Sequence, residues 1–193
     1  MDLLPKEHKH FQDETYWAKF FQDSKTSQGF EWYATFEDLE QYLKITLKDK
    51  ESSVLVVGCG NSLLSEKMHL KMGLTKITSI DFEDAVVKKM NNREKPIEYL
   101  CMDATNMIGF EDGKFDYAID KGTLDALCAD NTPETREKVK AYFNEVIRVI
   151  NPKGGTFICV SLLQDFVLDA VLDFFSQGSG NKHYEQNLID FRI

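Results

Sequence analysis

Residues 54–62 read Val-Leu-Val-Val-Gly-Cys-Gly-Asn-Ser, an apolar run that ends abruptly in a glycine-rich turn. The four apolar residues have the length and the β-branched content of a strand that is buried on both faces of a parallel sheet. Gly58 and Gly60 follow directly, and glycine lets the backbone turn sharply and approach a ligand without a Cβ clash. This stretch therefore predicts a buried strand followed by a tight turn into a helix.

Strands and helices alternate on the C-terminal side of this turn. Apolar spacing predicts helices over residues 63–72, 85–90, 135–150 and 165–175, with Gly73 ending the first of them. Short apolar runs predict strands over residues 76–80, 97–102, 115–119 and 156–160, and a last strand over residues 184–191. Alternating elements of this kind imply an α/β fold of the Rossmann-like class, with a mostly parallel central sheet and helices on both faces.

The chain has 193 residues, which is the usual size of one domain, so we predict a single domain over residues 1–193. Residues 1–50 are predicted to form a helical entry segment, because they are rich in aromatic residues and because apolar side chains recur at helical spacing between residues 35 and 47. Residues 51–161 are predicted to form the cofactor-binding core. Residues 162–193 are expected to add a helix and a strand.

The composition argues against several classes of partner. The formal net charge of −9 repels the phosphate backbone of nucleic acids, so DNA and RNA are not expected as partners. No apolar run approaches the roughly 18 residues of a membrane helix, and no membrane partner is expected. The four cysteines lack the spacing of a zinc site, so no metal is expected and the chain is predicted to work in the reducing cytoplasm.

Ligands of a parallel α/β sheet bind beyond the carboxyl ends of the strands, so residues at strand ends are candidates for a site. The turn formed by Gly58, Cys59, Gly60 and Asn61 is the first candidate. A dinucleotide site requires a third glycine, whose place is taken here by Leu63. The turn therefore favours a ligand without a phosphate group, such as S-adenosylmethionine, over NAD.

Two further strand ends carry acidic residues. Asp81 lies about twenty residues beyond the glycines, where a carboxylate can accept hydrogen bonds from both hydroxyls of a ribose, and Phe82 follows it. Asp103 is placed to accept a hydrogen bond from the amino group of adenine, with Met102 and Ala104 as apolar neighbours for the ring. These five residues complete the predicted adenosine half of the site.

The fourth strand is followed by Asp120-Lys121-Gly122-Thr123-Leu124-Asp125. In this architecture that loop faces the methyl group of the cofactor, so Asp120 and Lys121 are predicted to contact the cofactor. Asp120 is also a candidate catalytic residue, together with Trp32 and Tyr33 of the entry segment, as the lining of a channel for the acceptor. The alternative is that the aspartates only cap the turn or pair with Lys121, and that the two aromatic residues only pack the entry helix.

Two motifs carry a resemblance to a known family. The turn of residues 58–62 and the string of residues 120–127 resemble those of the seven-β-strand, class I S-adenosylmethionine-dependent methyltransferases that modify lysines of translation elongation factor 1-alpha. Residues 16–17 and 30–33 match the entry segment of that family, so the likeness spans residues 3–161. The resemblance implies S-adenosylmethionine as the cofactor, and a lysine of elongation factor 1-alpha or of a similar protein as the acceptor.

The sequence departs from that family in two respects. The likeness fades after Ser161, and one strand of the antiparallel end pair, the seventh, is expected to be missing. A two-domain member carries a second methyltransferase domain that methylates a protein N-terminus, and no counterpart of that domain is expected within residues 1–193. Two other functions would use the same cofactor residues: methylation of a small molecule, and a non-catalytic module that binds S-adenosylmethionine and holds a partner through its surface.

Overall fold

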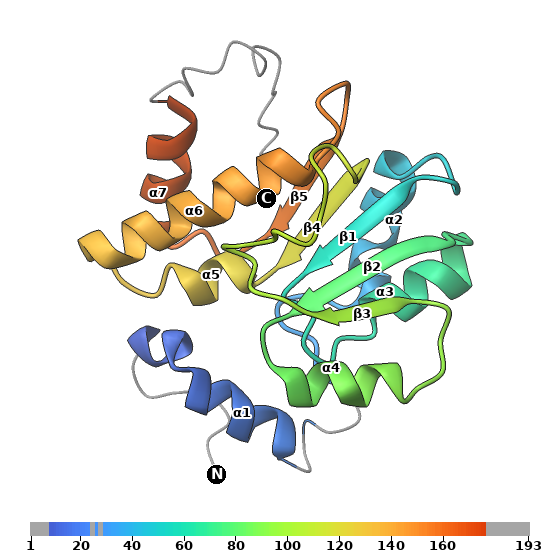
Figure 1. The fold of residues 1–193 in the computed structure, drawn as a ribbon, viewed down its shortest axis with the longest axis horizontal. Helices are drawn as coiled ribbons and strands as arrows, with labels where there is room; N and C mark the ends of the chain where they lie inside the picture. The colour runs from blue at the N-terminus through green and yellow to red at the C-terminus, as the bar shows by residue number, and fades with distance from the viewer. Residues whose placement is uncertain (1–7, 24–25, 27–28, 177–193) are drawn as a thin grey trace.

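A computed structural model describes residues 8–23, 26 and 29–176 of the chain. Its sheet has five strands, all parallel, in the order β3-β2-β1-β4-β5 (Figure 1). The strands are β1 (Ser53–Val57), β2 (Lys76–Asp81), β3 (Glu98–Cys101), β4 (Tyr117–Lys121) and β5 (Thr156–Val160). The predicted α/β fold of the Rossmann-like class is confirmed. The predicted strand over residues 184–191, and with it the question of a seventh strand, lies outside the described residues.

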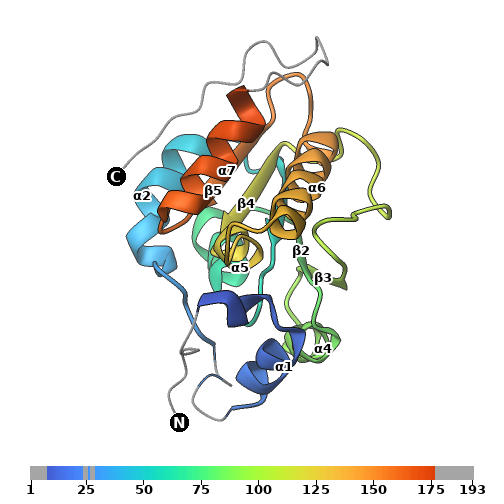
Figure 2. The same ribbon diagram turned by 90° about the vertical axis from the view of Figure 1, so that its left-hand side faces the viewer.

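Helices connect the strands and cover both faces of the sheet. The helices between or after the strands are α3 (Leu64–Lys67), which continues as the π-helical turn η2 (Met68–Met72), then α4 (Asp84–Asn91), α5 (Thr123–Leu127), α6 (Pro133–Val149) and α7 (Asp165–Ser176). The helix α2 (Phe36–Thr46) precedes β1. Figure 2 shows the sheet between α2 on one side and α6 on the other.

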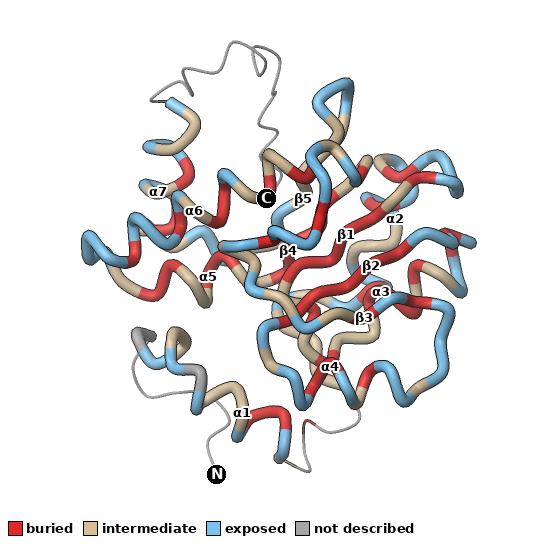
Figure 3. The backbone as a smooth tube through the Cα atoms, viewed as in Figure 1, coloured by how far each residue is buried: buried red, intermediate tan, exposed pale blue. Residues whose placement is uncertain are grey.

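The strand β1 lies at the centre of two hydrophobic clusters. Val54 and Val56 belong to the cluster formed with α2, α3 and α4, whereas Leu55 and Val57 belong to the cluster formed with α5, α6 and α7. All four side chains are at most 3% exposed, and the burial of the central strands is visible in Figure 3. The two-sided burial that the sequence predicts for this strand is therefore confirmed, since successive side chains of a strand point to opposite faces.

The predicted boundaries are wrong at the fourth strand. Phe115 forms only an isolated bridge with Ile150, and regular pairing of β4 with β1 begins at Tyr117. Consequently Asp120 and Lys121 lie within β4, rather than in a loop behind it. The residues that follow form the short helix α5, which apolar spacing did not reveal because a five-residue helix is too short to show a period.

The order of the strands creates a crevice at their carboxyl ends. From β1 the chain continues to β2 and β3 on one side of the sheet, and from β4 it continues to β5 on the other side. The parallel neighbours β1 and β4 are therefore followed by connections to opposite sides of the sheet. Ligands of open α/β sheets bind at such a switch point. The entry helices η1 (His8–Gln12) and α1 (Glu14–Gln22) lie across this edge, with η1 against α5 and α1 against α4 (Figure 1).

We expect Phe143→Ala to lower the free energy of unfolding by about 3–5 kcal/mol. Phe143 is 1% exposed, and its ring centroid lies 6.5 Å from that of Phe157 in β5 and 4.9 Å from that of Phe174 in α7. Truncation therefore leaves a cavity between three elements. Urea denaturation followed by circular dichroism measures the effect. Leu70→Ala is the control, because that side chain is 64% exposed, and equal losses for the two variants would contradict the assigned core.

Candidate cofactor and acceptor site

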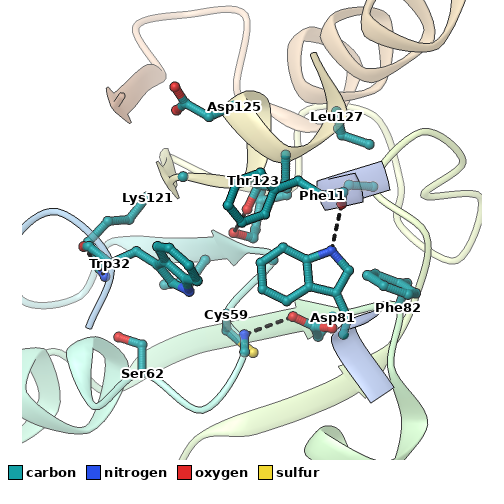
Figure 4. A pocket seen from close by; sticks show the side chains of 18 of the residues that line it. Phe11, Trp32, Cys59, Ser62, Asp81, Phe82, Lys121, Thr123, Asp125 and Leu127 are labelled. Atoms are coloured by element: carbon teal, nitrogen blue, oxygen red, sulfur yellow. Dashed lines mark hydrogen bonds between the residues drawn. The ribbon is translucent and has the colours of Figure 1, made fainter. Parts of the chain in front are cut away.

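A cavity of about 480 Å³ lies at the carboxyl ends of the strands and is walled on one side by η1 and α1 (Figure 4). Twelve of the thirteen predicted site residues line it: Trp32, Tyr33, Gly58, Cys59, Gly60, Asn61, Asp81, Phe82, Met102, Asp103, Ala104 and Lys121. The exception is Asp120. The lining residues that the sequence did not suggest include Phe11 and Trp17 of the entry helices and Leu127 of α5.

The glycine turn allows α5 to approach β1 closely. Gly58 has a φ of 58°, and a Cβ at this position would lie 2.0 Å from Oγ1 of Thr123. This hydroxyl donates a hydrogen bond of 2.9 Å to the carbonyl of Val57. Gly60 has a φ of 49°, and a Cβ there would meet the ring of Phe21 at 3.1 Å. Both positions have a positive φ that favours glycine, and at Gly58 the overlap with Thr123 excludes any side chain unless Thr123 moves.

The side chains of Cys59 and Asn61 are held by the surrounding fold, although both residues line the cavity. The Cys59 side chain belongs to the core, and burial raises the pKa of its thiol well above the ordinary value. Nδ2 of the Asn61 side chain donates a hydrogen bond to the carbonyl of Thr26, and the residue is 3% exposed. Both residues lie where the sequence predicts them, but their side chains hold the turn in place.

Asp81 lies at the wall of the cavity and is 5% exposed. Its Oδ2 accepts a hydrogen bond of 2.7 Å from the amide of Gly60, and its Oδ1 accepts one of 3.0 Å from the amide of Glu83. Burial raises the pKa of this carboxyl group to about 6, although both hydrogen bonds act in the opposite direction. Each carboxylate oxygen has a second lone pair, so Asp81 retains the capacity to accept from the hydroxyls of a ribose.

The residues after β2 and β3 form the apolar side of the same cavity. Phe82 is 41% exposed, which is unusual for a phenylalanine, and its ring lies beside Asp81 (Figure 4). Oδ1 of Asp103 accepts hydrogen bonds of 2.8 Å from both the amide and the hydroxyl of Thr105, so the carboxylate is held in a turn. Met102 and Ala104 flank it. An apolar wall with one fixed carboxylate suits an adenine ring.

Asp120 does not fit the catalytic and cofactor-contacting roles predicted for it. It is 0% exposed and is not among the residues that line the cavity. Its oxygens accept hydrogen bonds from the amides of Thr123 and Leu124, at 2.8 and 2.9 Å, and from the hydroxyl of Tyr142. Asp120 therefore caps the start of α5 from inside the protein, in agreement with the alternative that this aspartate caps the turn.

Glu31 is an important residue that the sequence reasoning missed. Its carboxylate accepts hydrogen bonds from Oγ of Ser62, at 2.7 Å, and from the amide of Leu63, at 2.8 Å, and it forms a 2.9 Å ion pair with Nζ of Lys121. A dinucleotide fold offers the amides at this helix start to a pyrophosphate. Here an internal carboxylate takes one of them, which agrees with a ligand that carries no phosphate. A charged residue amid Phe30, Trp32 and Tyr33 was the available signal.

The far end of the cavity is aromatic and acidic. Trp32 packs against Phe11 and Phe30, with ring centroids 5.7 and 5.0 Å apart. Asp125 is 2% exposed, and its Oδ1 accepts hydrogen bonds from Oγ of Ser161 and the amide of Leu162. Burial, followed by the charge of Asp125, raises the pKa of the Tyr33 hydroxyl above its ordinary value. These groups are suited to receive a polar acceptor after it has lost water.

Among the described residues, no group of histidine, cysteine and acidic side chains could hold a metal ion. The helices of the described ranges also include none that is long and apolar enough to cross a bilayer.

The parallel sheet, the phosphate-free turn and the acidic strand ends define a site of the class I methyltransferase type. A family model described as "Methyltransferase domain" matches residues 55–159, and the chain belongs to this family. Its cofactor is S-adenosylmethionine, and the cavity fits this cofactor because Asp81, Asp103 and the apolar residues beside them are arranged along one wall. A solved structure titled PH0226 protein, from Pyrococcus horikoshii OT3, has a TM-score of 0.51 and 26% identity, and covers 64% of this chain and 55% of that chain.

Two curated relatives show a closer likeness. One, named "eEF1A lysine and N-terminal methyltransferase homolog", from Drosophila pseudoobscura pseudoobscura, is 42% identical over 178 residues, which cover 90% of this chain and 26% of the relative. Another, named "EEF1A lysine methyltransferase 4", from Bos taurus, is 32% identical over 159 residues, which cover 78% of this chain and 62% of the relative. The chain thus spans about a quarter of the length of the first relative.

We expect Gly58→Ala to weaken binding of S-adenosylhomocysteine, the product of the cofactor, by at least about tenfold, because the added methyl group must displace Thr123 from β1. Isothermal titration calorimetry measures this affinity. Gly154→Ala is the matched control: Gly154 also has a positive φ, 117°, but a Cβ there meets no atom within 4 Å. If both variants bind like the unaltered protein, Gly58 is not required for the site.

Asp120→Asn is expected to change how stability depends on pH. Burial raises the pKa of Asp120 to about 7, above the value of about 3.9 in an unfolded chain. Between these two pH values Asp120 is protonated in the folded state and ionised in the unfolded state. The contribution of this group to stability is therefore complete below about pH 4 and is lost as the pH rises through about 7. Since asparagine does not titrate, the variant should gain stability relative to the unaltered protein between pH 5 and pH 8.

Urea denaturation at the two pH values tests this prediction. Asp116→Asn is the control, because the backbone hydrogen bond from Ser53 lowers the pKa of Asp116 and moves its effect to the acidic side. A stability difference between Asp120→Asn and the unaltered protein that is the same at pH 5 and pH 8 would show that Asp120 keeps an ordinary pKa.

Proposed function

We propose that this chain is a protein-lysine N-methyltransferase whose acceptor is translation elongation factor 1A or a similarly basic protein. The observation that carries the proposal is the 42% identity to a relative named for that activity, because it extends over 178 residues and so includes the entry segment as well as the cofactor core. The name of that relative also mentions N-terminal methylation. The relative named only for lysine methylation matches 78% of this chain, which favours lysine as the acceptor.

The aromatic and acidic end of the cavity supports an amine acceptor. A free lysine has a pKa of about 10.4 and must lose its proton before it can attack a methyl group. Burial among apolar groups lowers the pKa of a lysine, and Trp32 and Tyr33 offer such surroundings. Asp125 lies at the same end and would attract the acceptor while it is still an ammonium ion.

The residues at the other end of the cavity would bind the adenosine part of S-adenosylmethionine. S-adenosylmethionine supplies a methyl group on a positively charged sulfur, and the acceptor nitrogen displaces that sulfur in line. Asp81 would hold the ribose, and Asp103 with Phe82 would hold the adenine. The aromatic side chains of the entry segment would exclude water from the cavity between the two ends.

The overall charge also agrees with a basic acceptor. The chain carries a formal net charge of −9, and opposite charge on the partner speeds the encounter of two proteins. An acceptor from the translation machinery would suit the cytoplasmic setting expected from the cysteines, all four of which are unpaired.

The proposal predicts lysine methylation that depends on Asp81. Purified protein, S-adenosylmethionine and elongation factor 1A are incubated together, and new methyl groups are mapped by mass spectrometry. We expect methylation of a lysine side chain. Asp81→Asn should weaken cofactor binding by about tenfold, in the range for one lost polar partner, and reduce this methylation at limiting cofactor. Methyl groups found only on the N-terminal amine, or no modified lysine with cofactor-loaded protein, would contradict the proposal.

A further inference from the structure

A buried ion pair links Lys121, which lines the cavity, to Glu31, which does not. Nζ of Lys121 lies 2.9 Å from Oε2 of Glu31, and the two side chains are 4% and 19% exposed. Lys121 is the last residue of β4, whereas Glu31 belongs to the segment of residues 29–34 between α1 and α2. The pair therefore joins the entry segment to the sheet (Figure 4 shows Lys121 beside Trp32).

The same carboxylate is bonded to the glycine turn. Oε1 of Glu31 accepts from the amide of Leu63, and Oε2 accepts from the hydroxyl of Ser62 as well as from Lys121. Three segments far apart in the sequence thus meet at one side chain. Glu31 itself does not line the cavity, although Phe30, Trp32 and Tyr33 all do.

The backbone beside Glu31 is strained. Tyr33 has a φ of 62°, and the amide of Ala34 donates a 2.7 Å hydrogen bond to the carbonyl of Trp32, which is the pattern of a γ-turn centred on Tyr33. The ammonium group of Lys121 donates a 2.9 Å hydrogen bond to the same carbonyl. Residues in such conformations persist only where the surrounding structure holds them, and they are concentrated at functional sites.

A buried ion pair is weak evidence for stability, because the cost of removing two charges from water offsets much of their attraction. Two apolar side chains could join the same segments, but they would not fix the Trp32 carbonyl or the Leu63 amide. The charged pair differs in having directional hydrogen bonds, which fix the Trp32 carbonyl in the entry segment and the Leu63 amide in the glycine turn.

We propose that Glu31 is a positioning residue that, together with Lys121, holds the strained turn at Tyr33 and the glycine turn in register. The pair therefore couples the position of the aromatic residues 30–33 to the position of the glycine turn, so that loss of the Glu31 carboxylate would loosen both. The inference rests on the proposed function only where it describes the aromatic residues as the acceptor end of the cavity. The geometry of the pair is independent of which acceptor is methylated.

Hydrogen exchange of the cofactor-free protein, followed by mass spectrometry, tests the proposal without any acceptor. Glu31→Gln removes the charge from both turns, so amide exchange should accelerate by about tenfold or more in residues 29–34 and also in residues 58–63. Lys121→Met removes the ion pair with Glu31 and the donor to the Trp32 carbonyl, but it leaves Glu31 bonded to Ser62 and Leu63. That variant should accelerate exchange in residues 29–34 while residues 58–63 keep their protection.

The control is Glu66→Gln. Glu66 is also a buried glutamate in an ion pair, with Arg93, but it does not line the cavity. This variant should lower overall stability without selective exchange in residues 29–34. The proposal is overturned if Glu31→Gln leaves both segments protected, or if it only reproduces the exchange pattern of Glu66→Gln. Because no methyl transfer is measured, a failure of the proposed acceptor would leave this result unaffected.

Discussion

The close approach of α5 to the end of β1 is the constraint on which the rest of the site depends. The hydroxyl of Thr123 occupies the space that a side chain at Gly58 would fill, and it is bonded to the last carbonyl of β1. Asp120 caps the same turn from within, so α5 begins directly at the edge of the sheet. The connections after β1 and β4 run to opposite sides of the sheet, and the cavity lies at this switch point. Gly58 and Thr123, where α5 approaches β1, both line it.

The buried acidic residues near the cavity differ in whether their carboxylates face it or are bonded to groups inside the fold. Asp120 and Asp125 are both buried, yet only Asp125 lines the cavity, and Asp120 bonds entirely to groups inside the fold. The positive charge of Lys121 is matched by Glu31. Asp81 accepts from the turn that it faces. The acids that line the cavity are therefore Asp81 and Asp103 after β2 and β3, and Asp125 in α5.

The entry segment is part of the site and not an appendage to it. Its rings form one continuous cluster in which Trp17 stacks on Phe21, and Phe21 in turn covers Gly60. Gln12 donates to the carbonyl of Leu127 and to the hydroxyl of Thr135, which ties η1 to the helices on the other side of the cavity. The likeness to the first curated relative, which covers 90% of this chain, extends into this segment as well.

The alternation of strands and helices, the two-sided burial of residues 54–57 and twelve of the residues that line the cavity could be predicted from the sequence. These features depend on local periodicity and on the rule that strand ends gather at one edge, so residues near each strand end could be named in advance. That Asp125 lines the cavity and Asp120 does not could not be predicted, because the two residues are five positions apart on opposite ends of a turn too short to show a period. The tertiary structure alone revealed Glu31, because the partners of that carboxylate lie 31, 32 and 90 residues away in the chain and no local pattern encodes such a contact.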